Sequence, residues 1–146
     1  MVGCPDCAPP AGMIIDRQMI SPTKPAAPSE IVRAFFDHLS AGDRAAALDC
    51  WWPGAVWRVT GRSAWARDYT PEEYLAMGAQ WYASYPDYTY KFGRVSEAGE
   101  LAYFFVRSQG GEAPGEAEGM MIYRVVDGRI VEGWAIAASG GGDFGF

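Results

Sequence analysis

The stretch Tyr123–Ser139, YRVVDGRIVEGWAIAAS, decides the fold prediction because it has the pattern of a β-hairpin. Two apolar runs flank Asp127-Gly128, and Asp-Gly between alternating hydrophobic residues is a strong signal for a two-residue turn. The second arm ends in small apolar residues that begin at Ala135. The hairpin is therefore predicted to close an antiparallel sheet at the end of a folded domain.

The residues before the hairpin predict helices first and strands afterwards. A capping box is expected where Thr70 precedes Pro71 and Glu73. Ser29 is expected to cap the first helix, and Pro53-Gly54 to break the second. The expected order, by residue number, is helix 30–41, helix 44–51, strand 56–60, loop 61–70, helix 71–85, strand 88–92, strand 101–108, an acidic Gly-rich loop 110–119, and the hairpin. Helices followed by antiparallel strands indicate the α+β class.

The chain of 146 residues is predicted to form one folded domain, residues 29–139. Residues 1–28 form a Pro-rich arm without a sustained hydrophobic period, so we expect this arm to be flexible. Residues 140–146 are Gly-rich and are expected to be a tail.

Composition excludes several classes of function. The formal net charge is −6 and no Lys/Arg cluster is present, which argues against nucleic-acid and anionic-membrane partners. No apolar run approaches the roughly 20 residues of a membrane span, and no secretory signal is recognisable, so a cytoplasmic protein is expected. Aromatic residues make up 14% of the chain, more than a small core needs. This excess indicates that some of them line a cavity or an interface.

No cofactor or metal is expected. Cys4 and Cys7 form a CPDC motif in the Pro-rich arm, and a closed zinc site would need two more ligands. The other candidates, Cys50 and His38, fall in predicted helices of the domain. Two exposed thiols in a flexible arm are the preferred interpretation.

Four segments in order and spacing resemble SnoaL-like proteins of the nuclear transport factor 2-like superfamily. They are IVRAFFDHLSAGD (31–43), AVWRVTG (55–61), YPDYTYKF (85–92) and YRVVDGRIVEGW (123–134). The resemblance implies a cone-shaped, strongly curved antiparallel sheet wrapped around three N-terminal helices, with a deep apolar pocket between them. It also implies homodimers formed through the outer face of the sheet. The same fold serves isomerases, cyclases, epoxide hydrolases and non-catalytic binding modules, so the resemblance alone does not give the function.

The usual catalytic positions of these relatives carry unusual residues in this chain. Polyketide cyclases of the family commonly place an acid after the Trp of the last strand, and here that position is Ala135. An assisting His on the preceding strand corresponds to Met121, and the Asp of ketosteroid isomerase-like relatives corresponds to Arg58. Arg cannot serve as a base at neutral pH. We therefore expect no conventional acid–base pair at these positions.

Three polar residues remain as catalytic candidates. Alternation puts Arg58 with Val56 and Thr60 on the face that the resemblance makes the pocket face; it would orient or polarise a ligand carbonyl or carboxylate, or else pair with a local acid. Tyr123 shares a face with Met121 and would donate a hydrogen bond, or else pack in the core. Glu118 would be a base at the pocket rim, or else a solvated loop charge.

A second set of residues is expected to line the pocket or, alternatively, to staple the core. Trp81 and Tyr85 share a face of the third helix because they are four residues apart. The expected substrate-binding residues are Trp57, Trp65, Tyr69, Trp81, Tyr85, Tyr103, Phe105, Met121 and Ala135. Trp134 lies opposite Ala135 by alternation and is expected at the dimer face.

The preferred functional hypothesis is a cyclase that acts on a large, hydrophobic, polyketide-like intermediate. Without an acid–base pair, shape and one polar donor would promote an intramolecular cyclisation of the [4+2] cycloaddition type; the resemblance permits this, since such ring closures are proposed for some SnoaL-like proteins. One alternative is a binding protein for an apolar small molecule. Another is an isomerase or aldol cyclase that uses a carboxylate base, Glu118 or Asp49.

Overall fold

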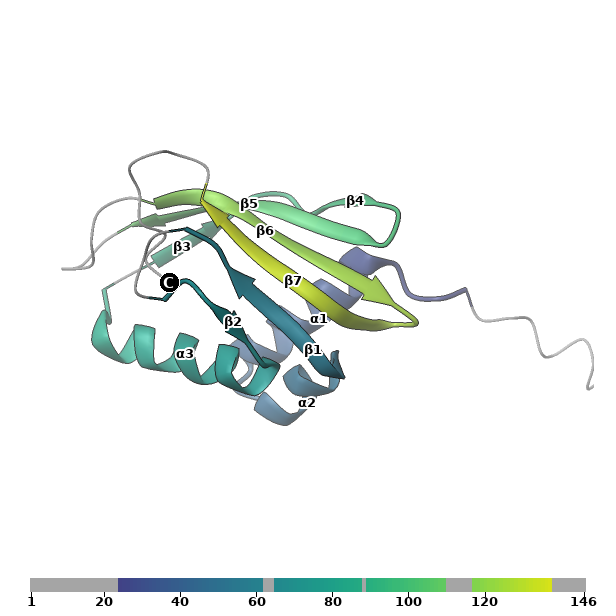
Figure 1. The fold of residues 1–146 in the computed structure, drawn as a ribbon, viewed down its shortest axis with the longest axis horizontal. Helices are drawn as coiled ribbons and strands as arrows, with labels where there is room; N and C mark the ends of the chain where they lie inside the picture. Colours follow the sequence, from purple (N-terminus) through teal and green to yellow (C-terminus); the bar gives the residue numbers. More distant parts are fainter. Residues whose placement is uncertain (1–23, 62–64, 88, 110–116, 138–146) are drawn as a thin grey trace, which may run out of the picture.

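Three helices lie against one side of a curved seven-stranded sheet, which confirms the α+β class (Figure 1). The computed structural model describes residues 24–61, 65–87, 89–109 and 117–137. The predicted loop segment 110–116, the tail 140–146 and residues 1–23 of the arm lie outside these ranges. The helices are α1 (Pro28–Ser40), α2 (Arg44–Asp49) and α3 (Pro71–Ser84), and the strands are β1 (Trp51–Val59), β2 (Asp68–Tyr69), β3 (Thr89–Phe92), β4 (Ser96–Ala98), β5 (Leu101–Gln109), β6 (Ala117–Val126) and β7 (Arg129–Ala137).

The helix starts show one confirmed and one wrong prediction. Helix α3 begins with the expected capping box, in which the Glu73 N–H donates to Thr70 Oγ1 at 3.1 Å and the Thr70 N–H donates to the Glu73 carboxylate at 2.9 Å. The N-cap position of helix α1 is Ala27 and not Ser29, and the Ala27 side chain makes no capping hydrogen bond. Pro28 takes the first helical position, where its fixed φ fits and its missing N–H is not needed. The Ser29 N–H donates instead to the Glu97 carboxylate at 2.8 Å.

The prediction that Pro53-Gly54 ends a helix is also wrong, because both residues lie inside β1. The pairing of β1 with β7 shifts register between Trp51 and Val56, and Gly54 adopts a φ of +81°. An irregularity of this kind tolerates a proline, since the local ladder is already interrupted. The strand thus begins at Trp51, a residue that the sequence places at the end of the second helix.

The sheet order is β2-β1-β7-β6-β5-β3, with β4 also paired to β5. All neighbouring strands are antiparallel except β1 and β7, which are parallel. The expected purely antiparallel sheet is therefore corrected to a mixed one. A parallel pair needs a long crossover, and here α3 and the intervening strands provide it.

The β6–β7 hairpin is confirmed. Asp127 and Gly128 have φ values of 49° and 76°, as a type I′ turn requires. Its register pairs Met121 with Ala135 and Tyr123 with Gly133. Strand β6 begins at Ala117, so residues 117–119 belong to the sheet and not to the predicted loop.

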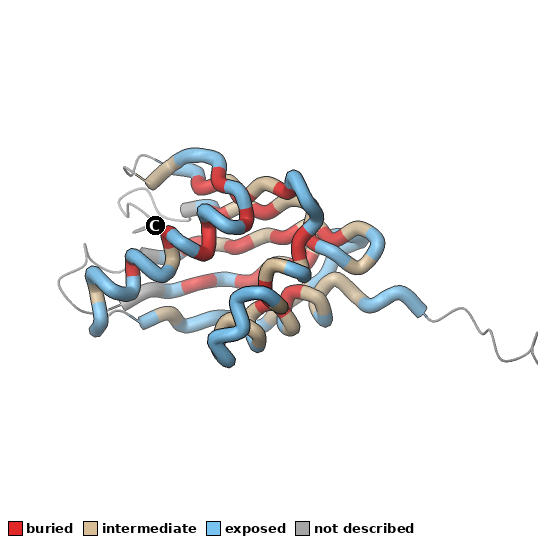
Figure 2. Tube along the Cα trace, turned by 90° about the horizontal axis from the view of Figure 1, so that it is seen from below, coloured by how far each residue is buried: buried red, intermediate tan, exposed pale blue. Residues whose placement is uncertain are grey.

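The core lies between the helices and the inner face of the sheet, where buried positions gather (Figure 2). Its centre is the Trp57 ring, which stacks with both Tyr74 (ring centroids 4.5 Å apart) and Tyr123 (5.1 Å). Gly133 makes room for this ring, because a Cβ at Gly133 would lie 2.5 Å from Trp57 Cε3. Aromatic packing therefore fixes the position of Tyr123 and Tyr74 relative to β1 and β7.

Candidate functional site

A cavity of about 400 Å³ opens beside this aromatic core, and we call it the central cavity. Helices α1 and α3 form one wall, strand β3 another, and Met121 reaches it from β6. Its volume is in the range of pockets that bind drug-sized ligands. Its lining residues are Phe36, Leu39, Ser40, Tyr74, Leu75, Met77, Gly78, Ala79, Trp81, Tyr82, Tyr90, Phe92 and Met121.

The chemistry of the central cavity is apolar with a few hydroxyl groups. None of the lining residues that the structure describes carries a carboxylate, imidazole, ammonium or guanidinium group. The hydroxyl groups belong to Ser40 and to three tyrosines, Tyr74, Tyr82 and Tyr90. Such a surface can bury a hydrophobic molecule and offer it neutral hydrogen bonds, but it supplies no general base near neutral pH.

Two buried tyrosine hydroxyls meet next to the central cavity. Tyr74 Oη and Tyr123 Oη are 3.4 Å apart, and the Tyr123 hydroxyl also donates to Met121 Sδ at 3.7 Å. Burial raises the pKa of Tyr74 to about 12 and raises the pKa of Tyr123 well above its ordinary value of 10. Both phenols are therefore neutral at physiological pH, and they act as donors and acceptors and not as bases.

Of the residues predicted to bind substrate, Trp81 and Met121 line the central cavity. Two others pack against the Trp81 ring: the centre of the Tyr85 ring lies 4.5 Å from it, and the centre of the Trp65 ring lies 6.0 Å away, edge to face. Trp57, Tyr69 and Ala135 are buried in the core on the inner side of the sheet. For these three, and for the ring of Tyr123, the structure favours the alternative of core packing.

Arg58 lies on the opposite side of the sheet from its predicted position. The core-facing residues of β1 are Ala55, Trp57 and Val59, so Arg58 points outward. Its guanidinium forms an ion pair with Glu132 and lies 5.9 Å from the centre of the Trp134 ring. Arg58 therefore pairs with a local acid, which was the alternative to a ligand-binding role, and the prediction that it faces the pocket is wrong. The alternation was correct, but the face assigned to it was reversed.

Three more of the predicted site residues, Glu118, Tyr103 and Phe105, also point outward from the sheet. Glu118 is exposed on β6 and pairs with Arg107 of β5, away from the central cavity. Phe105 is 62% exposed, and Tyr103 shares its face of β5. The burial pattern of both strands explains this correction, because Ala102, Phe104, Val106, Met121 and Tyr123 turn inward.

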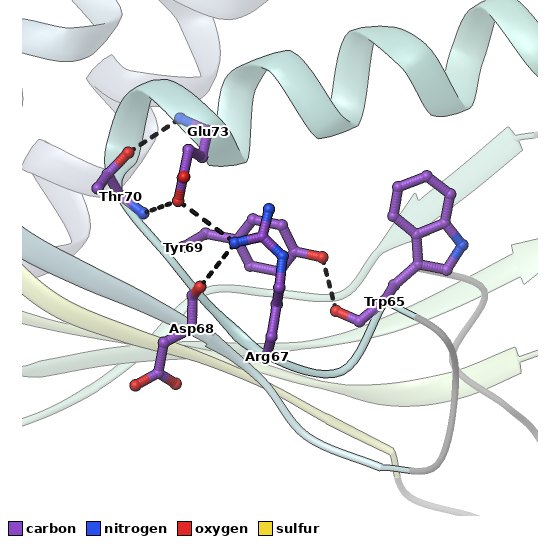
Figure 3. Close-up of polar contacts among 6 residues, drawn as sticks. All are labelled: Trp65, Arg67, Asp68, Tyr69, Thr70 and Glu73. Atoms are coloured by element: carbon purple, nitrogen blue, oxygen red, sulfur yellow. Dashed lines mark hydrogen bonds and ion pairs between the residues drawn. The ribbon is translucent and has the colours of Figure 1, made fainter.

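A polar cluster fixes the segment that carries Trp65 (Figure 3). The Tyr69 hydroxyl donates to the Trp65 carbonyl at 2.6 Å, and the Arg67 guanidinium lies 3.8 Å from the centre of the Tyr69 ring. Arg67 also contacts Glu73 of the α3 capping box at 3.4 Å. This cluster ties β2 to the start of α3, and it holds the Trp65 backbone beside the helix that lines the cavity.

Several lining residues were not predicted, and Tyr74 is the most important of them. It shares one face of α3 with Met77, Gly78 and Trp81, at spacings of three, four and seven residues. This helical period is visible in the sequence, and it predicts that Tyr74 lies on the same face of the helix as Trp81. The β3 residues Tyr90 and Phe92 also alternate as expected, but nothing in their pattern distinguishes a cavity from a core.

The described residues also bear on metals and membranes. No group of three or more His, Cys, Asp or Glu side chains that could hold a metal ion occurs among them. None of the described helices has the length and apolar character that a membrane crossing requires.

Comparison with solved structures relates the fold to known proteins. A loop-truncation variant of IdmH is 26% identical, with a TM-score of 0.61 over 75% of this chain and 91% of that chain. Wild-type IdmH from Streptomyces antibioticus, named as a proposed polyketide cyclase, is 23% identical, with a TM-score of 0.62 over 77% and 92% of the two chains. An NTF2-like protein from Burkholderia thailandensis is 21% identical, with a TM-score of 0.65 over 77% and 92%.

Sequence comparison gives the family. No curated protein matches the chain. The sequence model of the SnoaL-like domain matches residues 32–133, which include most of α1, the aromatic core and most of the β6–β7 hairpin. The chain therefore belongs to the SnoaL-like domain family.

Proposed function

We propose that this protein is a cyclase that folds a large, uncharged, polyketide-type intermediate inside the central cavity and promotes its ring closure. The observation that carries the proposal is the lining of the cavity, which is aromatic, aliphatic and hydroxyl-bearing, without an ionisable acid or base among its described residues. The name of IdmH, a proposed polyketide cyclase, supports the substrate class. A cytoplasmic location is part of the same proposal.

The reaction type follows from the absence of a base in the described lining. In an intramolecular [4+2] cycloaddition, two carbon–carbon bonds form between the ends of a diene and an alkene. Three π bonds become one new π bond and two σ bonds, so the product is an isomer of the reactant. No proton, electron or co-reactant is exchanged. Holding the chain in a near-attack geometry lowers the entropic part of the barrier, and one hydrogen bond to an activating carbonyl lowers it further.

A linear triene ketone that carries both diene and alkene tests the proposal directly. We expect the protein to accelerate formation of the cyclic isomer and to narrow the product distribution relative to buffer. Gly78→Leu should suppress both effects. Gly78 lines the cavity, and a Cβ at this position would have no heavy atom within 4 Å, so a leucine side chain would occupy the open space. Ala76→Leu is the matched control, since Ala76 is exposed on α3 outside the lining. Products identical to the buffer control across plausible trienes would contradict the proposal.

A binding protein for an apolar small molecule is the second candidate, because the same lining would serve it. The two differ in turnover. Saturable quenching of Trp fluorescence, with the ligand recovered unchanged, would favour the binder.

The acid–base alternative has less support from the geometry. Glu118 is paired with Arg107 on the outer face of the sheet, and Asp49 is exposed at the end of α2. Neither residue belongs to the lining of the central cavity.

We also propose that the protein forms a homodimer through the outer face of the sheet. Phe105 and Ile136 are exposed there, 62% and 38% respectively, beside the half-buried Trp134. Exposed apolar residues grouped on a sheet are typical of an interface. The ion pairs of Arg58 and Arg124 with Glu132 would lie within it.

A further inference from the structure

We infer that Tyr74 is the hydrogen-bond donor of the central cavity, that it binds a neutral carbonyl oxygen of the ligand, and that Tyr123 is the positioning residue behind it. The inference rests on the proposed function, since it names the group that recognises the intermediate. It replaces Arg58, which faces the other side of the sheet.

The contacts of the hydroxyl pair place it at the wall of the cavity. Tyr74 and Met121 both line the cavity, whereas Tyr123 does not. The Tyr123 hydroxyl contacts both of these residues, at 3.4 Å from Tyr74 Oη and 3.7 Å from Met121 Sδ. A ligand in the cavity therefore meets Tyr74 first, with Tyr123 as the second hydroxyl of the chain.

The pair has one more proton than good acceptors. Two phenols bring two O–H donors, and a single hydrogen bond joins their oxygens, so one proton has an oxygen acceptor and the Tyr123 proton has the Met121 thioether sulfur. A thioether is a weak acceptor. When a carbonyl oxygen arrives, Tyr74 can donate to it while Tyr123 donates to Tyr74 Oη. Such a chain strengthens the outer hydrogen bond, because each donor polarises the next.

Both rings are held rigidly, as preorganisation requires. Tyr74 and Tyr123 stack on the Trp57 ring with interplanar angles of 24° and 25°. Tyr123 also stacks on Phe104 at 17°. A donor fixed in this way does not have to reorganise when charge develops on the carbonyl oxygen.

The charge of the lining selects the class of ligand. A carboxylate buried here would lose its hydration without gaining a cation among the described lining residues, so an anionic ligand is disfavoured. A ketone or ester oxygen needs only one neutral donor. Since burial raises the pKa of Tyr74 to about 12, the phenol keeps its proton across the physiological range.

The test uses 6-propionyl-2-(dimethylamino)naphthalene, an apolar fluorescent ketone whose emission moves to longer wavelength when its carbonyl accepts a hydrogen bond. We expect it to bind the wild-type protein, and Gly78→Leu to abolish that binding. In Tyr74→Phe the bound emission should move to shorter wavelength and the Kd should rise about 5- to 10-fold, the loss of one hydrogen bond. In Tyr123→Phe the emission wavelength should lie between those of wild type and Tyr74→Phe, because Tyr74 keeps its hydroxyl but loses the hydrogen bond from Tyr123.

Tyr103→Phe is the matched control, because it removes a tyrosine hydroxyl from the outward face of β5, outside the residues that line the central cavity. It should leave the emission unchanged. Unfolding midpoints of all variants show whether the fold is retained, and removing a hydroxyl leaves the ring stacking intact. Binding with the same emission in wild type and Tyr74→Phe would overturn the donor assignment and leave the proposed function standing. Wild-type emission in Tyr123→Phe would overturn the positioning role alone. No binding to the wild type would overturn both the assignment and the proposed function.

Discussion

At the scale of single residues, Gly133 and Gly78 make opposite predictions for the same substitution. A Cβ at Gly133 would lie 2.5 and 2.7 Å from two Trp57 carbons, and Trp57 cannot move without disturbing its stack with Tyr74 and Tyr123. We expect Gly133→Ala to lower the free energy of unfolding by about 1–3 kcal/mol. Gly78→Ala should raise it by about 0.5–1 kcal/mol, because Gly78 is inside α3 with open space around it.

Urea unfolding of both variants measures the difference. Equal stabilities of Gly133→Ala and the wild type would show that the Trp57 stack is looser than described.

The buried phenols predict a loss of stability at high pH. Their pKa values are raised on folding, to about 12 for Tyr74, so they stabilise the fold fully below pH 10, the unfolded value. Between pH 10 and 12 the unfolded chain releases these protons and the folded chain keeps them. The free energy of unfolding should then fall by about 1.4 kcal/mol per pH unit for each such tyrosine.

Unfolding free energies at pH 8 and pH 11 give the measurement. The double variant Tyr74→Phe/Tyr123→Phe should lose less stability over this interval than wild type. Equal losses in wild type and double variant would contradict the burial of these hydroxyls.

Residue identity was easier to predict than residue orientation. Alternation correctly placed Arg58 and Trp57 on opposite faces of β1, and Arg124 and Tyr123 on opposite faces of β6. It could not say which face of β1 meets the helices, because that depends on packing between segments far apart in sequence. Arg58, Tyr103 and Phe105 therefore lie on the side of the sheet opposite to the predicted one, whereas Trp81 and Met121 line the central cavity.

At the scale of elements, the β6–β7 turn carries a local prediction. Gly128 has a φ of +76°, which an L side chain with a Cβ adopts with strain. Gly128→Ala should lower the free energy of unfolding by about 1–2 kcal/mol. Gly128→Asn should recover part of the loss, since Asn tolerates this conformation better. Thermal unfolding of wild type, Gly128→Ala and Gly128→Asn measures these differences. Identical stabilities would mean that the conformation of Gly128 does not contribute to the stability of the hairpin.

Elements with local signals were predicted well, and those set by distant contacts were not. The Asp127-Gly128 turn and the Thr70 capping box carry their own hydrogen-bonding chemistry, and both are confirmed. Strand β1 runs through Pro53-Gly54 because β7 pairs with Trp51 before the irregularity and with Val56 after it, and the parallel direction of that pair has no local signature. The short strands β2 and β4 depend on their partners in the same way.

At the scale of the whole molecule, the proposed dimer makes a concentration-dependent prediction. Phe105→Lys should shift the protein toward monomer, because it places a charge in the apolar part of the outer face. Tyr82→Lys changes an exposed aromatic residue on α3, away from that face, and should leave the dimer intact. Sedimentation equilibrium measures both. A wild-type protein that stays monomeric at all concentrations, or a Phe105→Lys variant that dimerises as wild type does, would contradict the interface.

The central claim for the whole molecule is that the cavity promotes ring closure by shape and a neutral donor, without an acid–base pair. The pH–rate profile of triene cyclisation tests this claim most directly. Between pH 4 and 9 we predict a flat kcat/KM, because the described lining has no carboxylate or imidazole and Tyr74 ionises only near pH 12. A limb with an apparent pKa between about 4 and 8, lost in Glu118→Gln or Asp49→Asn, would show a carboxylate base and contradict the claim.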